Sequence, residues 1–149
     1  MLGRNYSQLL AQLIGQTHWG IELPECLERF FQETGLAHSS PMDERRGGRV
    51  RIRTRALLIP EGGVPAIHRS TTPLGIYTCD FSKQGIGFLA SEQFYPTETV
   101  RLLLPTFWMR LEVVRCRYLG KTCYDNGSTL LERHEPSVAA FEPLERCHH

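Results

Sequence analysis

The N-terminal forty residues carry apolar side chains at helical spacing. This pattern predicts a short amphipathic helix over residues 6–14, with Ser7 as its N-cap. It also predicts a second helix over residues 25–35, which Gly35 would end. The apolar faces consist of Leu9, Leu10, Leu13 and Ile14 in the first helix, and of Cys26, Leu27, Phe30 and Phe31 in the second.

The period changes from helical to alternating at Arg49. Between residues 49 and 56, arginines occupy every second position up to Arg55, a pattern that is typical of a half-buried strand. The residues expected on its inner face are Val50, Ile52, Thr54 and Ala56. The simplest interpretation of Arg51, Arg53 and Arg55 is that they form the solvated face of this strand.

Further short apolar segments follow without intervening helices. They cover residues 66–82, 85–91, 98–105, 107–120 and 121–132. The last two would pair through a tight turn at 119–121, and imperfect alternation at Val113 and Val114 predicts a β-bulge. Strands at this spacing indicate a mainly β fold, an antiparallel barrel, because closure leaves no exposed sheet edge. The C-terminal segment is compatible with a short helix.

The chain of 149 residues is long enough for one core and too short for two full domains. Changes in composition divide it into a helical N-terminal extension at 1–40, a β-barrel domain at 41–135 and a C-terminal tail at 136–149. No segment approaches 18 consecutive apolar residues, so we expect no membrane insertion.

The five cysteines are odd in number and contain no CxxC pair. This usage is typical of a cytoplasmic protein with reduced thiols. Cys147, His148 and His149 gather at the C-terminus without a partner cluster, so we expect no metal site and no cofactor. The histidines are isolated, and neither GxSxG nor HExxH occurs. We therefore expect no enzymatic activity.

Positive charge is concentrated in one segment. The formal net charge of the chain is only +1, yet six arginines lie between residues 45 and 55. Arg45, Arg46 and Arg49 lie on or beside the Gly47-Gly48 pair, where the backbone can fold back. A planar guanidinium suits bidentate contacts with phosphates and base edges. The segment therefore indicates a localised anion site.

A second polar group lies about thirty residues further along the chain. Asp80, Ser82 and Gly85 occur in the stretch CDFSKQGIGF, between two apolar segments. Taken alone, such a turn needs no ligand, because Asp and Ser side chains bond to nearby backbone N–H groups and glycine supplies unusual dihedral angles.

Together, the two groups resemble the motifs of the PilZ domain family. RRGGR, with Arg45, Arg46 and Arg49, is similar to the RxxxR element in its fuller RRxxR form. DFSKQG, with Asp80, Ser82 and Gly85, is similar to the [D/N]xSxxG element. The resemblance covers about residues 43 to 132.

The resemblance implies a six-stranded antiparallel barrel that binds the bacterial second messenger cyclic di-GMP. In that reading, Arg45 and Arg46 hold phosphate and stack on or grip guanine. Arg49 bonds a guanine edge and phosphate from the barrel rim. Asp80 and Ser82 bond the opposing guanine, and Gly85 permits the shape of the turn. Ligand binding would pin the arginine arm and reorient residues 1–40, which a downstream protein partner would recognise.

Two other functions stay open from the sequence. A small barrel can bind RNA or single-stranded DNA through its basic strand, although such surfaces usually interleave aromatic residues with charges, and none lies between Asp43 and Ile76. The barrel can also be an interaction module without a ligand, with its basic strand docked on an acidic protein. The sequence does not identify the downstream partner, the ligand stoichiometry or the oligomeric state.

Overall fold

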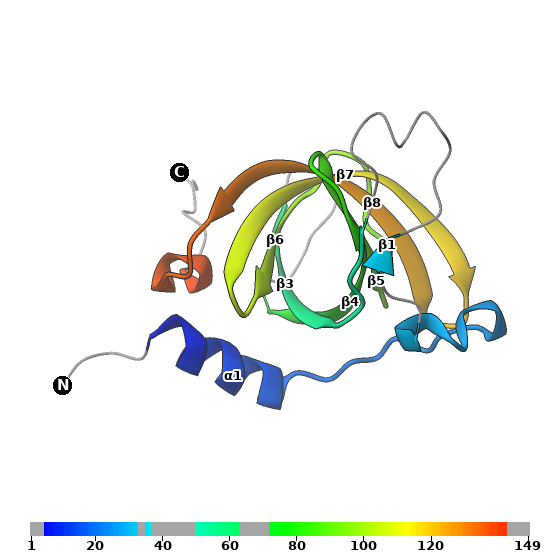
Figure 1. Ribbon diagram of the computed structural model, residues 1–149, viewed down its shortest axis with the longest axis horizontal. Coiled ribbons are helices and arrows are strands. Elements are labelled where there is room, and N and C mark those ends of the chain that lie inside the picture. The colour runs from blue at the N-terminus through cyan, green and yellow to red at the C-terminus, as the bar shows by residue number, and fades with distance from the viewer. Residues whose placement is uncertain (1–4, 33–34, 37–49, 63–71, 143–149) are drawn as a thin grey trace.

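A computed structural model describes residues 5–32, 35–36, 50–62 and 72–142 of the chain. Figure 1 shows a curved antiparallel sheet with helical turns at its periphery. The helical elements are α1 (Tyr6–Gln16), η1 (Glu25–Leu27), η2 (Phe30–Gln32) and η3 (Val138–Phe141). The strands are β1 (Gly35–Leu36), β2 (Val50–Arg51), β3 (Arg55–Gly62), β4 (Leu74–Phe81), β5 (Gly85–Ala90), β6 (Thr99–Leu104), β7 (Phe107–Gly120) and β8 (Cys123–His134).

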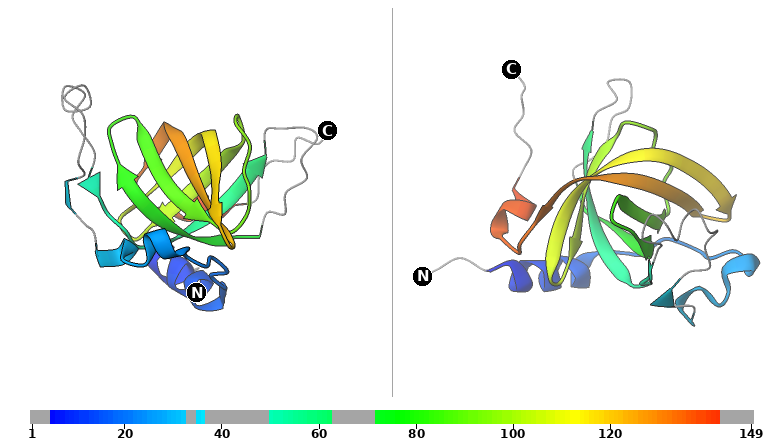
Figure 2. Two further views of the ribbon diagram at one scale, coloured as in Figure 1. Left: turned by 90° about the vertical axis from the view of Figure 1, so that its right-hand side faces the viewer. Right: turned by 45° about the horizontal axis from the view of Figure 1, so that its top comes forward.

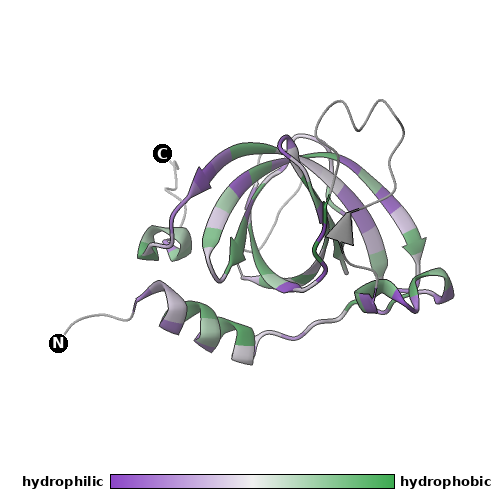
Figure 3. Cartoon of the chain, in the orientation of Figure 1, coloured by the Kyte–Doolittle hydropathy of each residue, from purple (hydrophilic) through white to green (hydrophobic). Residues whose placement is uncertain are grey.

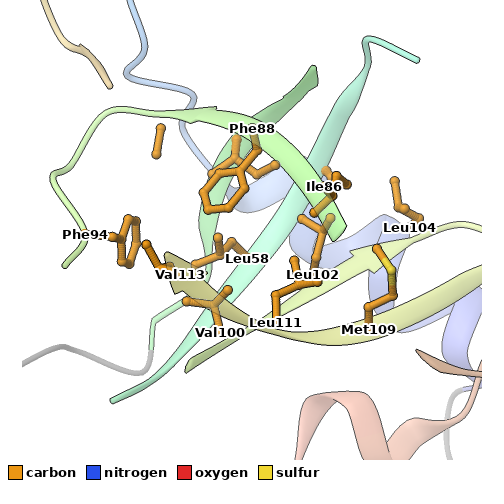
Figure 4. Close-up of a cluster of buried hydrophobic side chains, with 13 residues drawn as sticks. Leu58, Ile86, Phe88, Phe94, Val100, Leu102, Leu104, Met109, Leu111 and Val113 are labelled. Atoms are coloured by element: carbon orange, nitrogen blue, oxygen red, sulfur yellow. The ribbon is translucent and has the colours of Figure 1, made fainter. Parts of the chain in front are cut away.

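Six strands close into a barrel, which confirms the predicted fold class. The order is β4-β3-β6-β7-β8-β5, and β5 pairs again with β4. Strand β2 pairs with the C-terminal end of β4, and β1 pairs with β2 outside the barrel. Hydrophilic and hydrophobic residues are interspersed along the strands (Figure 3), and one face of each strand fills the interior. Strands β3 and β6 are buried over most of their length. Figure 4 shows this core of Leu, Ile, Val, Phe and Met side chains.

The predicted first helix is confirmed as α1, which lies across the outside of β3 (Figure 2). Tyr6 and Leu10 are its buried residues, and they join a second apolar cluster that includes Leu57 and Trp108. Asn5 caps the helix, because its side chain accepts a hydrogen bond from the backbone N–H of Gln8. The prediction of Ser7 as N-cap was wrong by two residues.

The predicted second helix is instead two 3-10 turns, η1 and η2. Phe30 is fully buried against the barrel, whereas Phe31 is 44% exposed and Cys26 is exposed. With three residues per turn, this segment cannot present four apolar residues on one continuous face. The predicted C-terminal helix is likewise only the short 3-10 turn η3.

The bulge and the tight turn that were predicted for the long β7–β8 hairpin are both present, but the turn lies at Lys121 and Thr122 and not at 119–121. The register shifts between Val113 and Arg115, which places a bulge at Val114. Gly120 pairs with Cys123, and Lys121 at the turn has a positive φ of 52°. The hairpin therefore turns within two residues and extends beyond the closed part of the barrel.

Of the three arginines that the alternation predicted on a solvated strand face, Arg55 is exposed, whereas Arg51 and Arg53 are half-buried. The guanidinium of Arg53 lies 4.3 Å from the ring centroid of Phe30, and that of Arg55 lies 4.9 Å from that of Trp19. Val50 and Ile52, which were expected inside, are 38% and 47% exposed. The predicted strand is also interrupted, because β2 ends at Arg51 and β3 begins at Arg55. Phe30 and Trp19 of the N-terminal extension pack against Arg53 and Arg55, and sequence alternation cannot reveal such contacts.

Trp19 fixes the path of the extension across the barrel. Its indole N–H donates to the carbonyl oxygen of Ile76 at 3.2 Å. Its ring occupies the space beside Gly75, where an added Cβ would lie 2.4 Å from a ring carbon. Gly75 therefore permits the close approach of the extension to β4. No helix among the described residues is long and apolar enough to cross a membrane.

Candidate functional site

Three of the predicted site residues lie at the turn between β4 and β5: Asp80 near the end of β4, Ser82 in the turn and Gly85 at the start of β5. The register of β4 against β5 shifts between Thr78 and Asp80. This bulge lies directly before Asp80, and bulges commonly redirect the side chains that follow them. Within the turn, the N–H of Ser82 donates to the carbonyl oxygen of Gly85 at 3.0 Å, and the Ser82 hydroxyl accepts from the N–H of Gln84 at 3.3 Å.

Gly85 is required by close packing between strands. An added Cβ would lie 1.9 Å from the carbonyl oxygen of Ser128 on β8, and real side chains do not tolerate such a distance to backbone. The predicted role of Gly85 in shaping the turn therefore has a specific cause, namely the contact with β8. The same contact brings β8 into the site, which the sequence motif does not indicate.

Asp80 belongs to a row of five directly paired residues that crosses five strands. Arg51 of β2 pairs with Asp80 of β4, and Asp80 pairs with Gly87 of β5. Gly87 pairs with Gly127 of β8, and Gly127 pairs with Arg115 of β7. Directly paired residues of neighbouring strands project from the same face of a sheet. We call this row the glycine trough.

The floor of the glycine trough has no side chains of its own. An added Cβ on Gly87 would lie 3.0 Å from a carboxylate oxygen of Asp80, and one on Gly127 would lie 2.8 Å from a guanidinium nitrogen of Arg115. The two charged side chains therefore lie over the glycines from opposite ends. Glycine within a strand often marks a place where a ligand approaches the backbone closely.

A pocket of about 180 Å³ lies over this floor. It is smaller than the 300 to 1,000 Å³ that is usual for a drug-sized ligand. The described residues can therefore hold part of a nucleotide, such as one planar base, and the rest would need further groups. The lining residues are Asp80, Ser82, Gln84, Gly85, Ile86, Gly87, Val114, Arg115, Gly127, Ser128 and Thr129.

The structure brings together three of the six predicted site residues: Asp80, Ser82 and Gly85 all line this pocket. The other three, Arg45, Arg46 and Arg49, lie outside the described residues. Val50 follows them directly in the chain, and it pairs with Phe81, next to Asp80.

Two further cations of the glycine trough were missed by the sequence reasoning. Arg51 is half-buried and Arg115 is exposed. Within the part of the chain that the structure describes, neither guanidinium has a hydrogen-bonded or ion-paired partner. Arg51 was assigned to a solvated face, and Arg115 follows a predicted bulge. The bulge was the available signal, because bulges are over-represented beside functional sites.

The thiol of Cys79 lies directly before Asp80 and is buried under the extension. Burial raises its pKa well above the usual range, and the negative charges of Asp125 and Asp80 raise it further. Burial also raises the pKa of Cys123, in the same cluster, to about 11. Both thiols are therefore neutral near pH 7, and they contribute to the apolar packing between the extension and the barrel.

The extension borders the trough through Arg53. Its guanidinium donates to the carbonyl oxygen of Phe30 at 3.1 Å, and its Nε donates to that of Cys79 at 3.4 Å. One side chain thus joins η2 of the extension to the strand that carries Asp80. Among the described residues, no group of His, Cys, Asp and Glu side chains has the arrangement of a metal site.

Comparison with known proteins gives no relative for this chain: no protein-family model, no curated protein and no solved structure matches it. The fold and the site together define a small antiparallel β-barrel with a polar, glycine-floored trough on its outer surface. The functional argument therefore rests on the residues of this trough.

Proposed function

We propose that the protein is a receptor for cyclic di-GMP and that the glycine trough is part of its binding site. The observation that carries the proposal is the paired row of Arg51, Asp80, Gly87, Gly127 and Arg115. It offers a carboxylate and two guanidinium groups that have no partner among the described residues, around a floor of two glycines. Such a receptor would act in the cytoplasm of a bacterium, and the proposal assigns no catalytic residue.

The chemistry of the trough suits a guanine nucleotide. A carboxylate can accept hydrogen bonds from the N1–H and the amino group of guanine, and a guanidinium can bond its O6 and N7 atoms or grip a phosphate. Asp80 would take the donor edge of the base. Arg115, from the other end of the trough, would bond the acceptor edge or a phosphate. The flat floor between them would permit a planar base to approach the backbone.

The arginine arm would supply what the small pocket lacks. Arg49 is joined directly to Val50, whose strand pairs with Phe81 beside Asp80. The chain that leads into β2 is therefore attached at the trough itself. Each charge-assisted hydrogen bond contributes about 1.5 to 3 kcal/mol. Three or four such bonds, less the entropy of ordering the arm, would give roughly micromolar affinity, at about −8 kcal/mol.

The contact between Arg53 and the extension offers a route for signal output. Arg53 contacts both Phe30 and the carbonyl of Cys79. A ligand bound to Asp80 and to the arginine arm would shift β2, which pairs with β4 at Asp80, and would change the position of Arg53 relative to η2. Residues 1–40 would then shift against the barrel and alter the surface that a downstream protein recognises.

Isothermal titration tests the proposal directly. The intact chain is titrated with cyclic di-GMP, with the linear GMP dinucleotide and with a short oligonucleotide, each at two salt concentrations. We expect preference for the cyclic compound and loss of binding in Asp80→Ala and Arg49→Ala. Lys121→Ala, at the far hairpin turn, serves as the control that keeps binding. Absence of binding to all three compounds would refute the proposal and leave an interaction module.

One structural feature favours nucleic acid as the second candidate. Tyr118 and Tyr124 lie on the β7–β8 hairpin with ring centroids 5.1 Å apart, and Tyr118 is 58% exposed. Bases stack on exposed aromatic side chains beside cations, and Arg117 lies next to Tyr118 in the chain. In the same titration, this function would appear as preference for the oligonucleotide with steep weakening by salt.

A further inference from the structure

A second and larger cavity lies at the end of the barrel where the β4–β5 and β6–β7 turns meet. Its volume is about 630 Å³, within the range of small-molecule sites. Figure 4 shows Leu104, one of its lining residues, at the end of the core away from Phe94. Six apolar or ring-bearing side chains form most of its wall: Val50, Ile52, Phe81, Leu104, Pro105 and Phe107.

This cavity lies on the other face of β2 from the glycine trough. Val50 pairs with Phe81, and both residues line the cavity. The next pair, Arg51 and Asp80, belongs to the trough. Because successive residues of a strand point to opposite faces, the short strand β2 separates the two sites. Of the residues that the structure describes, Ser82 alone lines both of them.

The apolar wall remains accessible to solvent. Val50 and Ile52 are 38% and 47% exposed, although both side chains line the same cavity. Other parts of the outer face are covered by α1 and by the 3-10 turns. Contiguous exposed apolar surface on a small protein commonly marks a binding site.

The described charged residues at the cavity have a single sign. Lys83 and Arg133 line it, and no carboxylate of the described ranges does. In the described ranges, neither cation has an ion-pair partner. The guanidinium of Arg133 lies 4.0 Å from the ring centroid of Phe107. Stacking orients the plane of the guanidinium and leaves its N–H edge available for a carboxylate.

We propose that this cavity binds a small amphipathic anion, with its apolar chain or ring against the wall and its carboxylate at Lys83 and Arg133. Size, apolar wall and paired cations together define this class of ligand. An acidic peptide is less well matched, because the apolar wall is a cavity on one side of a two-residue strand and not an extended groove. The proposal does not depend on cyclic di-GMP binding, because Arg133, Lys83 and Ile52 do not line the trough pocket.

The test uses three probes with the same ten-carbon chain and different head groups: decanoate, decanol and decyltrimethylammonium. Each is titrated into the intact protein below its micelle concentration, and binding is followed by calorimetry and by amide chemical shifts. We expect one saturable decanoate site, at least about tenfold tighter than the site for either other compound. The shifts should gather around Val50–Ile52, Lys83 and residues 104–107.

Two charge variants and two matched controls locate the head group. Arg133→Gln and Lys83→Gln should each weaken decanoate binding about tenfold and leave decanol binding unchanged. Arg117→Gln and Lys121→Gln, which alter exposed cations of the β7–β8 hairpin, should leave both unchanged. Ile52→Asp should weaken decanoate most, because it places a carboxylate in the apolar wall. All four cations are exposed in the structure, so these variants should fold.

Several results would overturn the proposal. Equal affinity for decanoate and decyltrimethylammonium would show that the cavity does not recognise the negative charge of the ligand. Equal effects of Arg117→Gln and Arg133→Gln would show that only general charge matters. Non-saturating binding, or amide shifts away from the cavity, would mean that no such site exists. Binding of an acidic peptide at these residues without any binding of decanoate would assign the surface to a protein partner.

Discussion

Arginines on two sides of the barrel differ in the number of hydrogen-bond and ion-pair partners that their guanidinium groups have. On the side of α1 and η3, the Nε of Arg101 donates to Glu61 at 2.6 Å, and its Nη1 donates to the carbonyl oxygens of Ala140 and Glu142 at 3.0 and 2.8 Å. On the trough side, Arg51 and Arg115 have no such partner among the described residues. The same residue type thus occurs in two different environments in one small domain.

This difference separates the guanidinium groups that stabilise the fold from those that have no partner among the described residues. Arg101 is buried, and its hydrogen bonds tie the C-terminal turn to the barrel. Arg110 also bonds Glu61, and this hydrogen bond raises the pKa of the Arg110 guanidinium. A satisfied buried cation is expensive to remove, because its partner would stay behind uncompensated. An unpartnered exposed cation has no such structural consequence.

The largest effect should follow from Arg101→Ala. This variant leaves the carboxylate of Glu61, whose side chain is only 7% exposed, with Arg110 alone. Removal of one partner of a buried ion pair typically costs about 3 to 5 kcal/mol, and we expect a loss of that size in the free energy of unfolding, measured by urea denaturation. Arg117→Ala is the matched control: its ion pair with Asp125 is exposed and should contribute less than about 1 kcal/mol.

A loss of stability in Arg101→Ala as small as that in the control would contradict a structural role of Arg101. It would mean that Arg110 alone compensates Glu61 and that the carbonyl contacts of η3 contribute little. The double variant of Arg101 and Arg110 would then locate the remaining stabilisation.

Local features of the barrel could be predicted from the sequence because they depend on near neighbours. The break in alternation at Val113 and Val114 predicted the bulge, and the residues around Gly120 predicted the hairpin turn. The motif around Asp80 predicted a polar turn between two strands, which the β4–β5 turn confirms. These features depend on the residues of one or two adjacent segments.

The packing of the N-terminal extension on the barrel could not be predicted in this way, and neither could the position of Arg115 in the glycine trough. Arg53 and Arg55 have the spacing of a solvated face, and only the path of the extension puts Phe30 and Trp19 over them. Arg115 reaches the trough through the pairing of β7 with β8, about thirty-five residues after Asp80. Contacts that close a barrel join distant segments, and the period of one strand contains no information about its neighbour.

A loss of stability of intermediate size should follow from Gly85→Ala, which changes the shape of the trough and leaves its charges unchanged. Gly85→Ala places a Cβ 1.9 Å from the carbonyl oxygen of Ser128, so the two strands must move apart. Overpacking of this kind typically costs about 1 to 3 kcal/mol. Gly15→Ala is the control, because nothing lies within 4 Å of its added Cβ in α1, and it should stabilise the protein by about 0.5 to 1 kcal/mol. Equal behaviour of the two variants in urea denaturation would contradict the close contact.

The smallest effect on stability should come from Arg115→Ala. This variant tests directly whether an exposed trough arginine differs from the buried Arg101. Because the guanidinium is exposed and has no partner among the described residues, its removal should change the free energy of unfolding by less than about 0.5 kcal/mol. The same variant should lower the affinity for cyclic di-GMP about tenfold, since one charge-assisted contact with the ligand is lost. Urea denaturation and calorimetric titration of one preparation measure both quantities. A fall in stability that matches the fall in affinity would place Arg115 with the structural arginines, whereas a fall in affinity alone marks it as a ligand contact.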